Sequence, residues 1–145
     1  MAARLTKTQV KDLFATGDKP SQADFANFID STITPLMGIV TDVATLVATD
    51  AATADIFRIT LTESVTLSNP TNVIDGQMIT WWIAQDGTGG WDVTLDSKFD
   101  MPSSAAPLVW STAANKMDML AVRYDASADL FRVISFIPGY TIPLS

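Results

Sequence analysis

The hydrophobic period of this chain changes near residue 55, and that change constrains its fold more than any other feature. Before residue 55, Phe25, Phe28 and Ile29 recur at the spacing of one helical face. After it, apolar and polar residues alternate, as in Phe57–Leu61, which is typical of half-buried strands. The sequence therefore predicts an α+β protein. Short N-terminal helices form an anchor or stalk over residues 1–55, and an antiparallel β-sandwich or barrel domain follows over residues 56–145.

Two short helices are expected in the N-terminal region. The first spans Thr6–Ala15 and stops before Gly17. Ser21 is a suitable N-cap for the second, and Asp24 stands at its third position, where a carboxylate favours the helix dipole. Pro35 ends or kinks this helix because proline lacks a backbone N–H.

Apolar residues after Pro35 extend the helical pattern. Leu36, Ile39, Val43 and Leu46 alternate at spacings of three and four, which makes a heptad seam of two repeats. Two repeats cannot hold a coiled coil alone, so an ordinary core helix and a seam between subunits remain equally open. The positions expected to hold an oligomer together, or to anchor it, are Phe25, Phe28, Ile29, Leu36, Ile39, Val43 and Leu46.

The remaining sequence predicts strands at regular spacing. Met78–Ala84 is apolar on both faces, so this strand is central or is covered by another subunit. The three glycines of Asp86–Gly90 indicate a hairpin that returns through Trp91, Val93 and Leu95. Two long strands follow, Lys116–Tyr124 and Leu130–Ile137, with Met119 and Ala121 facing the side opposite to Leu120 and Val122.

Composition excludes most catalytic chemistry. The chain has no histidine and no cysteine, which rules out Ser-His-Asp and Cys-His nucleophiles and thiolate or imidazole zinc sites. The carboxylates Asp86, Asp92, Asp96 and Asp100 lack calcium-loop spacing, so we interpret them as solvated strand and turn residues. We expect no enzyme activity, no cofactor and no metal. A net charge of −7 argues against nucleic acid, and no apolar run reaches the length of about 20 residues needed to span a membrane.

Four tryptophans are the largest side chains of the β region: Trp81, Trp82, Trp91 and Trp110. Trp81 and Trp82 are adjacent in a strand, so they face opposite sides of the sheet. Core packing is the default role for most of the four. The functional alternative is a platform that stacks on a sugar or inserts between subunits.

Two segments resemble phage structural proteins. Leu13–Ser31 (LFATGDKPSQADFANFIDS) is similar to a stretch near the start of many phage fibre and virion structural proteins, where it precedes a helix. Ser111–Asp125 (STAANKMDMLAVRYD) resembles the segment that opens the last hairpin of a recurrent fibre or appendage module. The two segments occur in the expected order and, together with the β region between them, the resemblance spans most of the chain.

This resemblance implies a non-enzymatic virion protein, commonly trimeric, that is assembled in the host cytoplasm. Because the sequence has no long shaft, it favours a short homotrimeric knob on the capsid, either a cement protein or a head fibre. A tail fibre or baseplate component, or a carbohydrate-binding receptor-recognition module, is the alternative. The expected partners are further copies of the chain, the major capsid protein or other virion proteins, and a host surface glycan.

Overall fold

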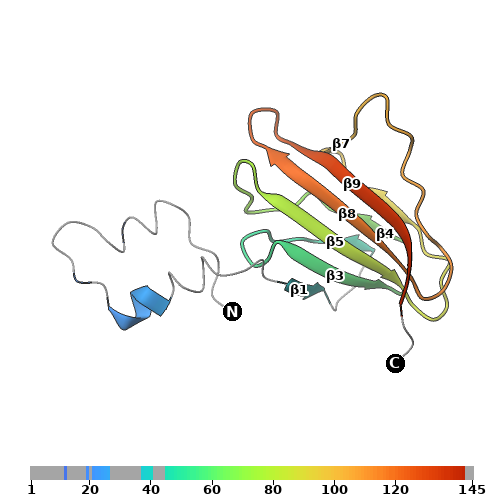
Figure 1. Cartoon of the computed structure of the whole chain (residues 1–145), viewed down its shortest axis with the longest axis horizontal. Helices are drawn as coiled ribbons and strands as arrows, with labels where there is room; N and C mark the ends of the chain where they lie inside the picture. Colours follow the sequence, from blue (N-terminus) through green and yellow to red (C-terminus); the bar gives the residue numbers. More distant parts are fainter. Residues whose placement is uncertain (1–11, 13–18, 20, 27–36, 41–44, 143–145) are drawn as a thin grey trace.

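The structure, a computed structural model, describes residues 12, 19, 21–26, 37–40 and 45–142 (Figure 1). Strands account for most of the regular secondary structure in the described residues, as expected for the predicted β domain. In place of the expected N-terminal helices, the described residues contain one short helix at 22–26. The helix expected over Thr6–Ala15 lies outside them apart from Asp12, which is helical. The strands are β1 (Met37–Val40), β2 (Leu46–Val47), β3 (Ile56–Leu61), β4 (Val65–Leu67), β5 (Met78–Gln85), β6 (Val93–Leu95), β7 (Phe99–Asp100), β8 (Lys116–Asp125) and β9 (Leu130–Thr141).

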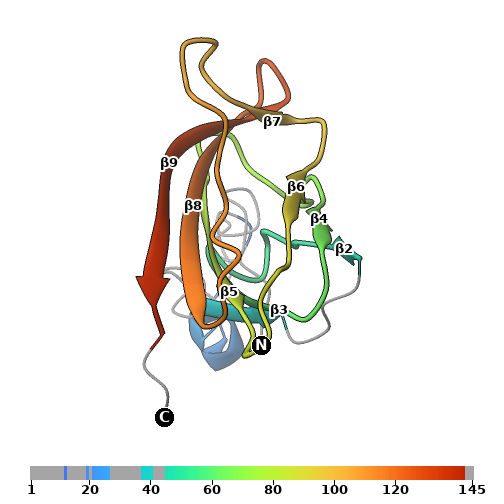
Figure 2. The ribbon, with the colours of Figure 1, turned by 90° about the vertical axis from the view of Figure 1, so that its right-hand side faces the viewer.

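The first six strands alternate between two sheets. β1, β3 and β5 lie side by side in a six-stranded sheet of order β1-β3-β5-β8-β9-β7, and β2, β4 and β6 form a second sheet. All of these neighbouring pairs are parallel, so Met37, Ile56 and Thr80 stack in register, as do Leu46 and Thr66. The chain therefore winds as a flattened coil, and each pass adds one strand to each of the two layers visible in Figure 2.

The antiparallel sandwich or barrel predicted from the sequence is thus wrong for this part of the fold. Alternation of apolar and polar residues identifies strands but carries no information about their direction. One signal did point to parallel pairing, because near-continuous apolar runs such as Met78–Ala84 are typical of parallel strands covered on both faces.

The C-terminal third of the fold is antiparallel. β8 pairs with β5 on one side and with β9 on the other, and β7 adds a short parallel contact to β9. The two long strands predicted here are confirmed, with β9 continuing to Thr141. Leu120 and Val122 are fully buried while Met119 and Ala121 are half-buried, which confirms that they face opposite sides of β8.

The helical seam predicted after Pro35 is wrong. Met37–Val40 and Leu46–Val47 are strands β1 and β2, the first members of the two parallel stacks. The β-structure therefore starts before the boundary expected at residue 55. The physical reason is the high content of β-branched residues in this segment, which disfavour helix and suit strands.

The predicted start of the second helix is confirmed. The Ser21 hydroxyl accepts a hydrogen bond from the Asp24 backbone N–H at 3.2 Å, and the Asp24 carboxylate accepts one from the Ser21 backbone N–H at 2.7 Å. This reciprocal pair is a capping box with aspartate in the usual place of glutamate. It lowers the pKa of Asp24, chiefly through the hydrogen bonds from the Ser21 side chain and backbone.

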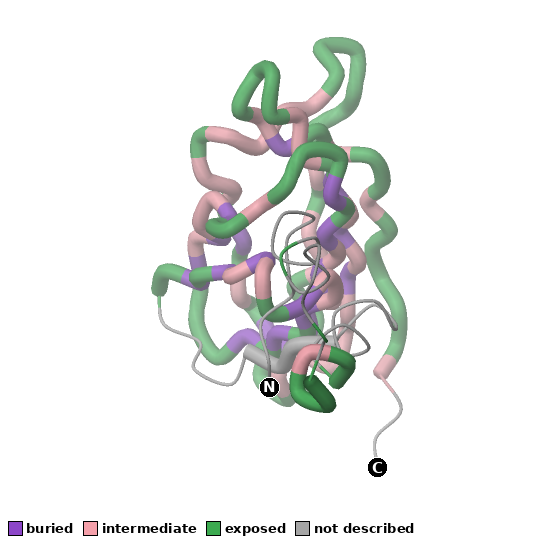
Figure 3. Tube along the Cα trace, turned by 90° about the vertical axis from the view of Figure 1, so that its left-hand side faces the viewer, coloured by how far each residue is buried: buried purple, intermediate pink, exposed green. Residues whose placement is uncertain are grey.

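The core lies between the two sheets, where Figure 3 shows the buried positions gathered in the β region. Trp81 is its largest member and is 0% exposed. Its ring centroid lies 6.5 Å from that of Phe57 and 5.8 Å from that of Phe99, and its indole N–H donates to the Thr49 hydroxyl at 3.1 Å. A buried indole N–H needs such a partner, so Thr49 completes the core.

The hairpin predicted at Asp86–Gly90 is also wrong, because β5 and β6 belong to different sheets and β6 pairs with β4. The loop crosses from one layer to the other instead. Its glycines are explained by contact with the segment 112–114, since Gly89 and Gly90 have positive φ and the Gly90 N–H donates to the Thr112 carbonyl at 2.6 Å.

Candidate functional site

The outer face of the six-stranded sheet carries an apolar patch. Trp81 faces the core, so Trp82 faces outward in a row with Arg58, Met119 and Ile137. The next row contains Thr60, Ala84, Met117 and Tyr140. We call Trp82, Met117, Met119, Ile137 and Tyr140 the outer-face patch.

The side chains of this patch are accessible. Ile137 and Tyr140 are each 44% exposed, and Trp82, Met117 and Met119 are half-buried. A solvated sheet face normally carries polar residues, whereas contiguous exposed apolar side chains mark contact surfaces.

The charge of this face differs from that of the whole chain. The chain has 16 acidic and 9 basic residues, yet the outward rows of β3, β5, β8 and β9 carry a single carboxylate, that of Asp125 at the end of β8, which pairs with Arg132. Arg58 and Arg123 are exposed on these rows, and neither forms an ion pair within the described ranges. The strands of the outer face therefore carry more basic than acidic side chains, in contrast to the acidic chain as a whole.

The four tryptophans, for which the sequence predicts core packing with a ligand platform as the alternative, occupy different environments. Trp81 is a core residue, which corrects its assignment to a ligand platform. Trp91 and Trp110 are half-buried against the core, where the Trp91 indole N–H donates to Asp86 at 3.0 Å and Trp110 meets Phe136 edge to face at 4.8 Å. Of the four, Trp82 alone belongs to the outer-face patch.

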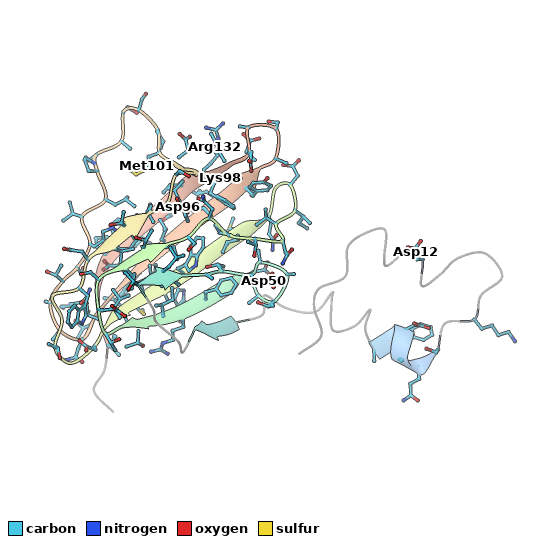
Figure 4. The ribbon with its side chains drawn as sticks, turned by 180° about the vertical axis from the view of Figure 1, so that it is seen from behind. Asp12, Asp50, Asp96, Lys98, Met101 and Arg132 are labelled. Atoms are coloured by element: carbon cyan, nitrogen blue, oxygen red, sulfur yellow. The ribbon has the colours of Figure 1, made fainter. Side chains whose placement is uncertain are left out.

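An ionic network fixes the end of the β8–β9 hairpin. Lys98 forms an ion pair with Asp129 at 2.6 Å, and the Tyr124 hydroxyl donates to the same carboxylate at 3.0 Å. Arg132 bridges Asp100 of β7 and Asp125 at the end of β8. Figure 4 shows Lys98 and Arg132 at this end of the molecule.

These contacts shift the ionisation of the network. The Lys98 hydrogen bond, followed by that of Tyr124, lowers the pKa of Asp129, and the same carboxylate raises the pKa values of Lys98 and Tyr124. Hydrogen bonds from Ser127 and then Arg132 lower the pKa of Asp125. At neutral pH, Lys98, Asp125, Asp129 and Arg132 are therefore charged, the Tyr124 hydroxyl keeps its proton, and these contacts hold the turn closed.

An open groove lies beside this network, on the outer face. One part, with a volume of about 570 Å³, is lined by polar groups of Asp75, Arg123, Tyr124, Asp125 and Arg132 and by apolar groups of Met78 and Ile134. A second part of about 520 Å³ shares Asp75, Gly76 and Met78 with the first and extends to Ile56 and Ile74. Such a mixture of convergent polar groups and apolar walls is typical of ligand sites.

Sequence reasoning missed this groove. Its walls come from residues 55–56, 74–80, 123–125 and 132–134, which only the sheet register brings together. The one local signal was the turn composition at Asp75-Gly76 and at Asp125–Asp129, which marks loops but does not indicate that they converge.

The carboxylates that were considered as a metal site each have a different structural role. Asp86 accepts hydrogen bonds from Thr88, Gly89 and Trp91, and those from Gly89 and then Trp91 are the main cause of its lowered pKa. Asp96 accepts from the backbone of Ser97 and Asn69, which lowers its pKa, while Asp100 pairs with Arg132. In the parts of the chain that the structure describes, no three potential metal ligands cluster.

The positions expected at an oligomer or anchor interface are only partly described. Phe25 is 49% exposed in the helix at 22–26, Leu46 is 61% exposed in β2, and Ile39 lies in β1. Phe28, Ile29, Leu36 and Val43 lie outside the described residues. Of the described positions, Ile39 and Leu46 belong to different sheets, and the interface as a whole stays a prediction.

Comparison with known proteins gives one match. Residues 47–128 match the family described as "Putative phage tail fibre C-terminal domain". The chain belongs to this family. The match begins in β2 and ends in the β8–β9 turn, so it includes the stacked coil from Val47 onward, without β1, and the walls of the groove up to Asp125. No curated protein and no solved structure matches the chain.

Membership of the tail fibre family identifies a phage structural protein of the fibre type, in agreement with the resemblance found in Leu13–Ser31 and Ser111–Asp125. It does not single out capsid decoration. Among the described residues of this tail fibre domain, no helix has the length and hydropathy to cross a membrane.

Proposed function

We propose that this chain is a non-enzymatic component of a phage tail fibre within the virion. The observation that carries this proposal is the family match over residues 47–128, which favours a tail fibre over the cement protein or head fibre expected from the sequence. A structural role fits the chemistry of the chain, because it contains no histidine or cysteine, and the carboxylates of Asp86, Asp100 and Asp125 are engaged in a turn and in ion pairs.

The location can be tested on the virion itself. An antibody raised against the purified chain should label purified phage particles at the tail when they are viewed by electron microscopy. Labelling of the head would instead support capsid decoration, and an absence of label, with the protein also missing from the particle by mass spectrometry, would contradict both.

We further propose that the groove beside the ionic network contacts a glycan of the host surface. Sugars present hydroxyls that charged side chains such as Asp75 and Arg123 bind, together with apolar faces that Met78 and Ile134 can cover. Purified wild-type protein should compete with phage for adsorption to permissive cells. Substitution Arg123→Glu should weaken this competition, and Lys116→Glu, on the same strand but away from the groove, should leave it unchanged.

The proposed assembly is a homotrimer. Oligomers of identical subunits are generally closed and symmetric, and the outer-face patch is a surface that an isolated subunit leaves exposed. Light scattering at micromolar concentration should give the mass of three chains, and a stable monomer would contradict this proposal.

A further inference from the structure

Two arginines lie directly opposite each other in the wall of the groove. Arg123 of β8 pairs in register with Arg132 of β9, and Met78 of β5 continues the same row on the other side of Arg123. All three side chains line the groove. Like charges at directly opposite positions of an antiparallel pair destabilise a sheet. The fold therefore carries this pair of arginines despite a cost in stability.

The two arginines differ in their partners. Arg132 binds Asp100 on one side and Asp125 on the other, so its charge is compensated within the fold. Arg123 is exposed, and its guanidinium forms neither an ion pair nor a hydrogen bond within the described ranges. A free guanidinium presents N–H donors in a planar fork that matches a carboxylate or a phosphate. Arg123 is thus a cationic group in the groove wall that the described fold leaves without a partner.

The two carboxylates of the groove wall are engaged elsewhere. One oxygen of Asp125 accepts hydrogen bonds from Ser127, and the other accepts them from Arg132. One oxygen of Asp75 accepts a hydrogen bond from the Ala126 backbone N–H at 3.1 Å, which fixes the orientation of this side chain. Its second oxygen forms no hydrogen bond within the part of the chain that the structure describes, so it is available to a ligand hydroxyl.

The apolar walls extend the groove across the sheet. Ile134 belongs to β9, Met78 to β5 and Ile56 to β3, so the groove crosses four neighbouring strands, with Arg123 of β8 between Met78 and Ile134. Three strand spacings amount to about 14 Å, which is longer than one sugar ring. The groove therefore has room for several linked sugars, with Arg123 beside an inner part of the chain rather than at its end.

We propose that the groove binds an acidic glycan, with a carboxylate or phosphate group of the glycan on Arg123. The bound anion compensates the charge that the fold leaves unpaired and weakens the repulsion between Arg123 and Arg132. Asp75 accepts a hydrogen bond from a neighbouring hydroxyl. A chain with a net charge of −7 repels anionic polysaccharide in general, so this contact depends on the local cation. The inference rests on the proposed contact with a host-surface glycan and names the chemical class of that glycan.

The surface polysaccharide of permissive cells is the probe for this proposal. Immobilised full-length protein should retain the labelled polysaccharide. In one arm of the experiment the carboxylates of the polysaccharide are reduced to alcohols, and in the other its phosphates are removed with hydrofluoric acid. At least one treatment should abolish retention, and that treatment identifies the anion. Undiminished retention after both treatments together would overturn the acidic class but leave the glycan contact intact. Failure to retain the untreated polysaccharide would contradict the glycan contact itself, and this inference with it.

Substitutions separate the Arg123 site from a general effect of charge. Arg123→Gln should raise the polysaccharide concentration needed for half-maximal retention about tenfold or more, because a hydrogen bond between charged groups is lost. Arg123→Lys should restore part of the binding, since lysine keeps the charge but not the planar fork. The matched control is Arg58→Gln. Arg58 is also an exposed outer-face arginine without an ion pair in the described ranges, but it does not line the groove, so retention should be unchanged. Equal losses in Arg123→Gln and Arg58→Gln would overturn the assignment.

The stability of Arg123→Gln distinguishes a binding role from a structural one. The urea midpoint of this variant should equal or exceed that of wild type, because the substitution removes the like charge opposite Arg132. A clearly lower midpoint would show that Arg123 supports the fold, which would contradict the argument that its free charge serves a ligand.

Discussion

Gly89 holds the crossing loop between β5 and β6 against the segment 112–114, and its replacement should be unusually costly. The Asp86 carboxylate accepts hydrogen bonds from the backbone of Thr88 and Gly89, which shapes the loop. Gly89 has φ +69, and a Cβ added there would lie 2.5 Å from the Ala114 nitrogen and 2.6 Å from the Thr112 carbonyl oxygen. Both atoms are backbone, so a side-chain rotation cannot relieve the clash.

Gly89→Ala would be destabilised both by the positive φ and by the backbone clash, and two neighbouring glycines allow these two contributions to be measured separately. Gly90 has φ +89 with no atom near an added Cβ, so Gly90→Ala should destabilise the protein by about 1–2 kcal/mol through backbone strain alone. Gly87 has neither feature, and Gly87→Ala should range from neutral to about 1 kcal/mol stabilising, through loss of freedom in the unfolded chain. Gly89→Ala combines the backbone clash with the strain of a positive φ, and we expect it to lower the free energy of unfolding by about 3 kcal/mol or more.

Urea unfolding followed by tryptophan fluorescence measures all three variants against wild type. Gly87→Ala should be the most stable of the three variants, Gly90→Ala should be intermediate, and Gly89→Ala should be the least stable. If Gly89→Ala were as stable as Gly90→Ala, the close approach of this loop to Thr112 and Ala114 would be wrong, and with it the account of why the loop is rich in glycine.

Three further outcomes follow from particular contacts. Thr49→Val should destabilise the fold by about 1–2 kcal/mol in urea, because the buried Trp81 indole N–H loses its acceptor, whereas Thr49→Ser should retain most of the stability. Asp118 is 2% exposed, and its carboxylate accepts hydrogen bonds from the Ser111 and Gly139 backbone N–H groups at 2.7 and 2.8 Å. Asp118→Ala should therefore lower the free energy of unfolding by about 3–5 kcal/mol, and Asp118→Asn, which keeps one acceptor oxygen, should lower it less. The phenolate absorbance of a Tyr140→Phe protein should titrate above pH 10.0, because Asp129 raises the pKa of Tyr124, and adding Asp129→Asn should lower the midpoint towards 10.0. The stability that Tyr124 contributes is complete below pH 10.0 and is lost as the pH rises through its folded pKa. The stability contributed by Asp129, whose pKa is lowered, is complete above pH 3.8 and is lost as the pH falls through its folded pKa. Thermal unfolding measured across pH should show that both the alkaline and the acid loss of stability are smaller in Asp129→Asn than in wild type.

The strands of this protein could be predicted from local pattern, but their arrangement could not. Alternation at Phe57–Leu61 and the apolar run Met78–Ala84 both identify real strands, β3 and β5. These strands are parallel neighbours because the chain visits the other layer between them, at β4. The connecting segments carry ordinary turn residues, and turn chemistry does not reveal whether a chain returns to the same sheet or crosses to another.

The outer-face patch and the groove depend on the register of the strands. In β9, strict alternation of inward and outward residues predicts the wrong side chains on each face. Val133 pairs with Val122 and Phe136 pairs with Leu120, so Val133 and Phe136 both face the core although they are three residues apart. The register shift between them displaces Ile134, which is 52% exposed and lines the groove beside Met78. A pattern of period two would instead place Ile134 inside with Phe136 and leave Val133 outside. Because an extra residue in one strand reassigns every side chain beyond it, the surface that we propose as a contact is defined by a feature that no local sequence signal marks.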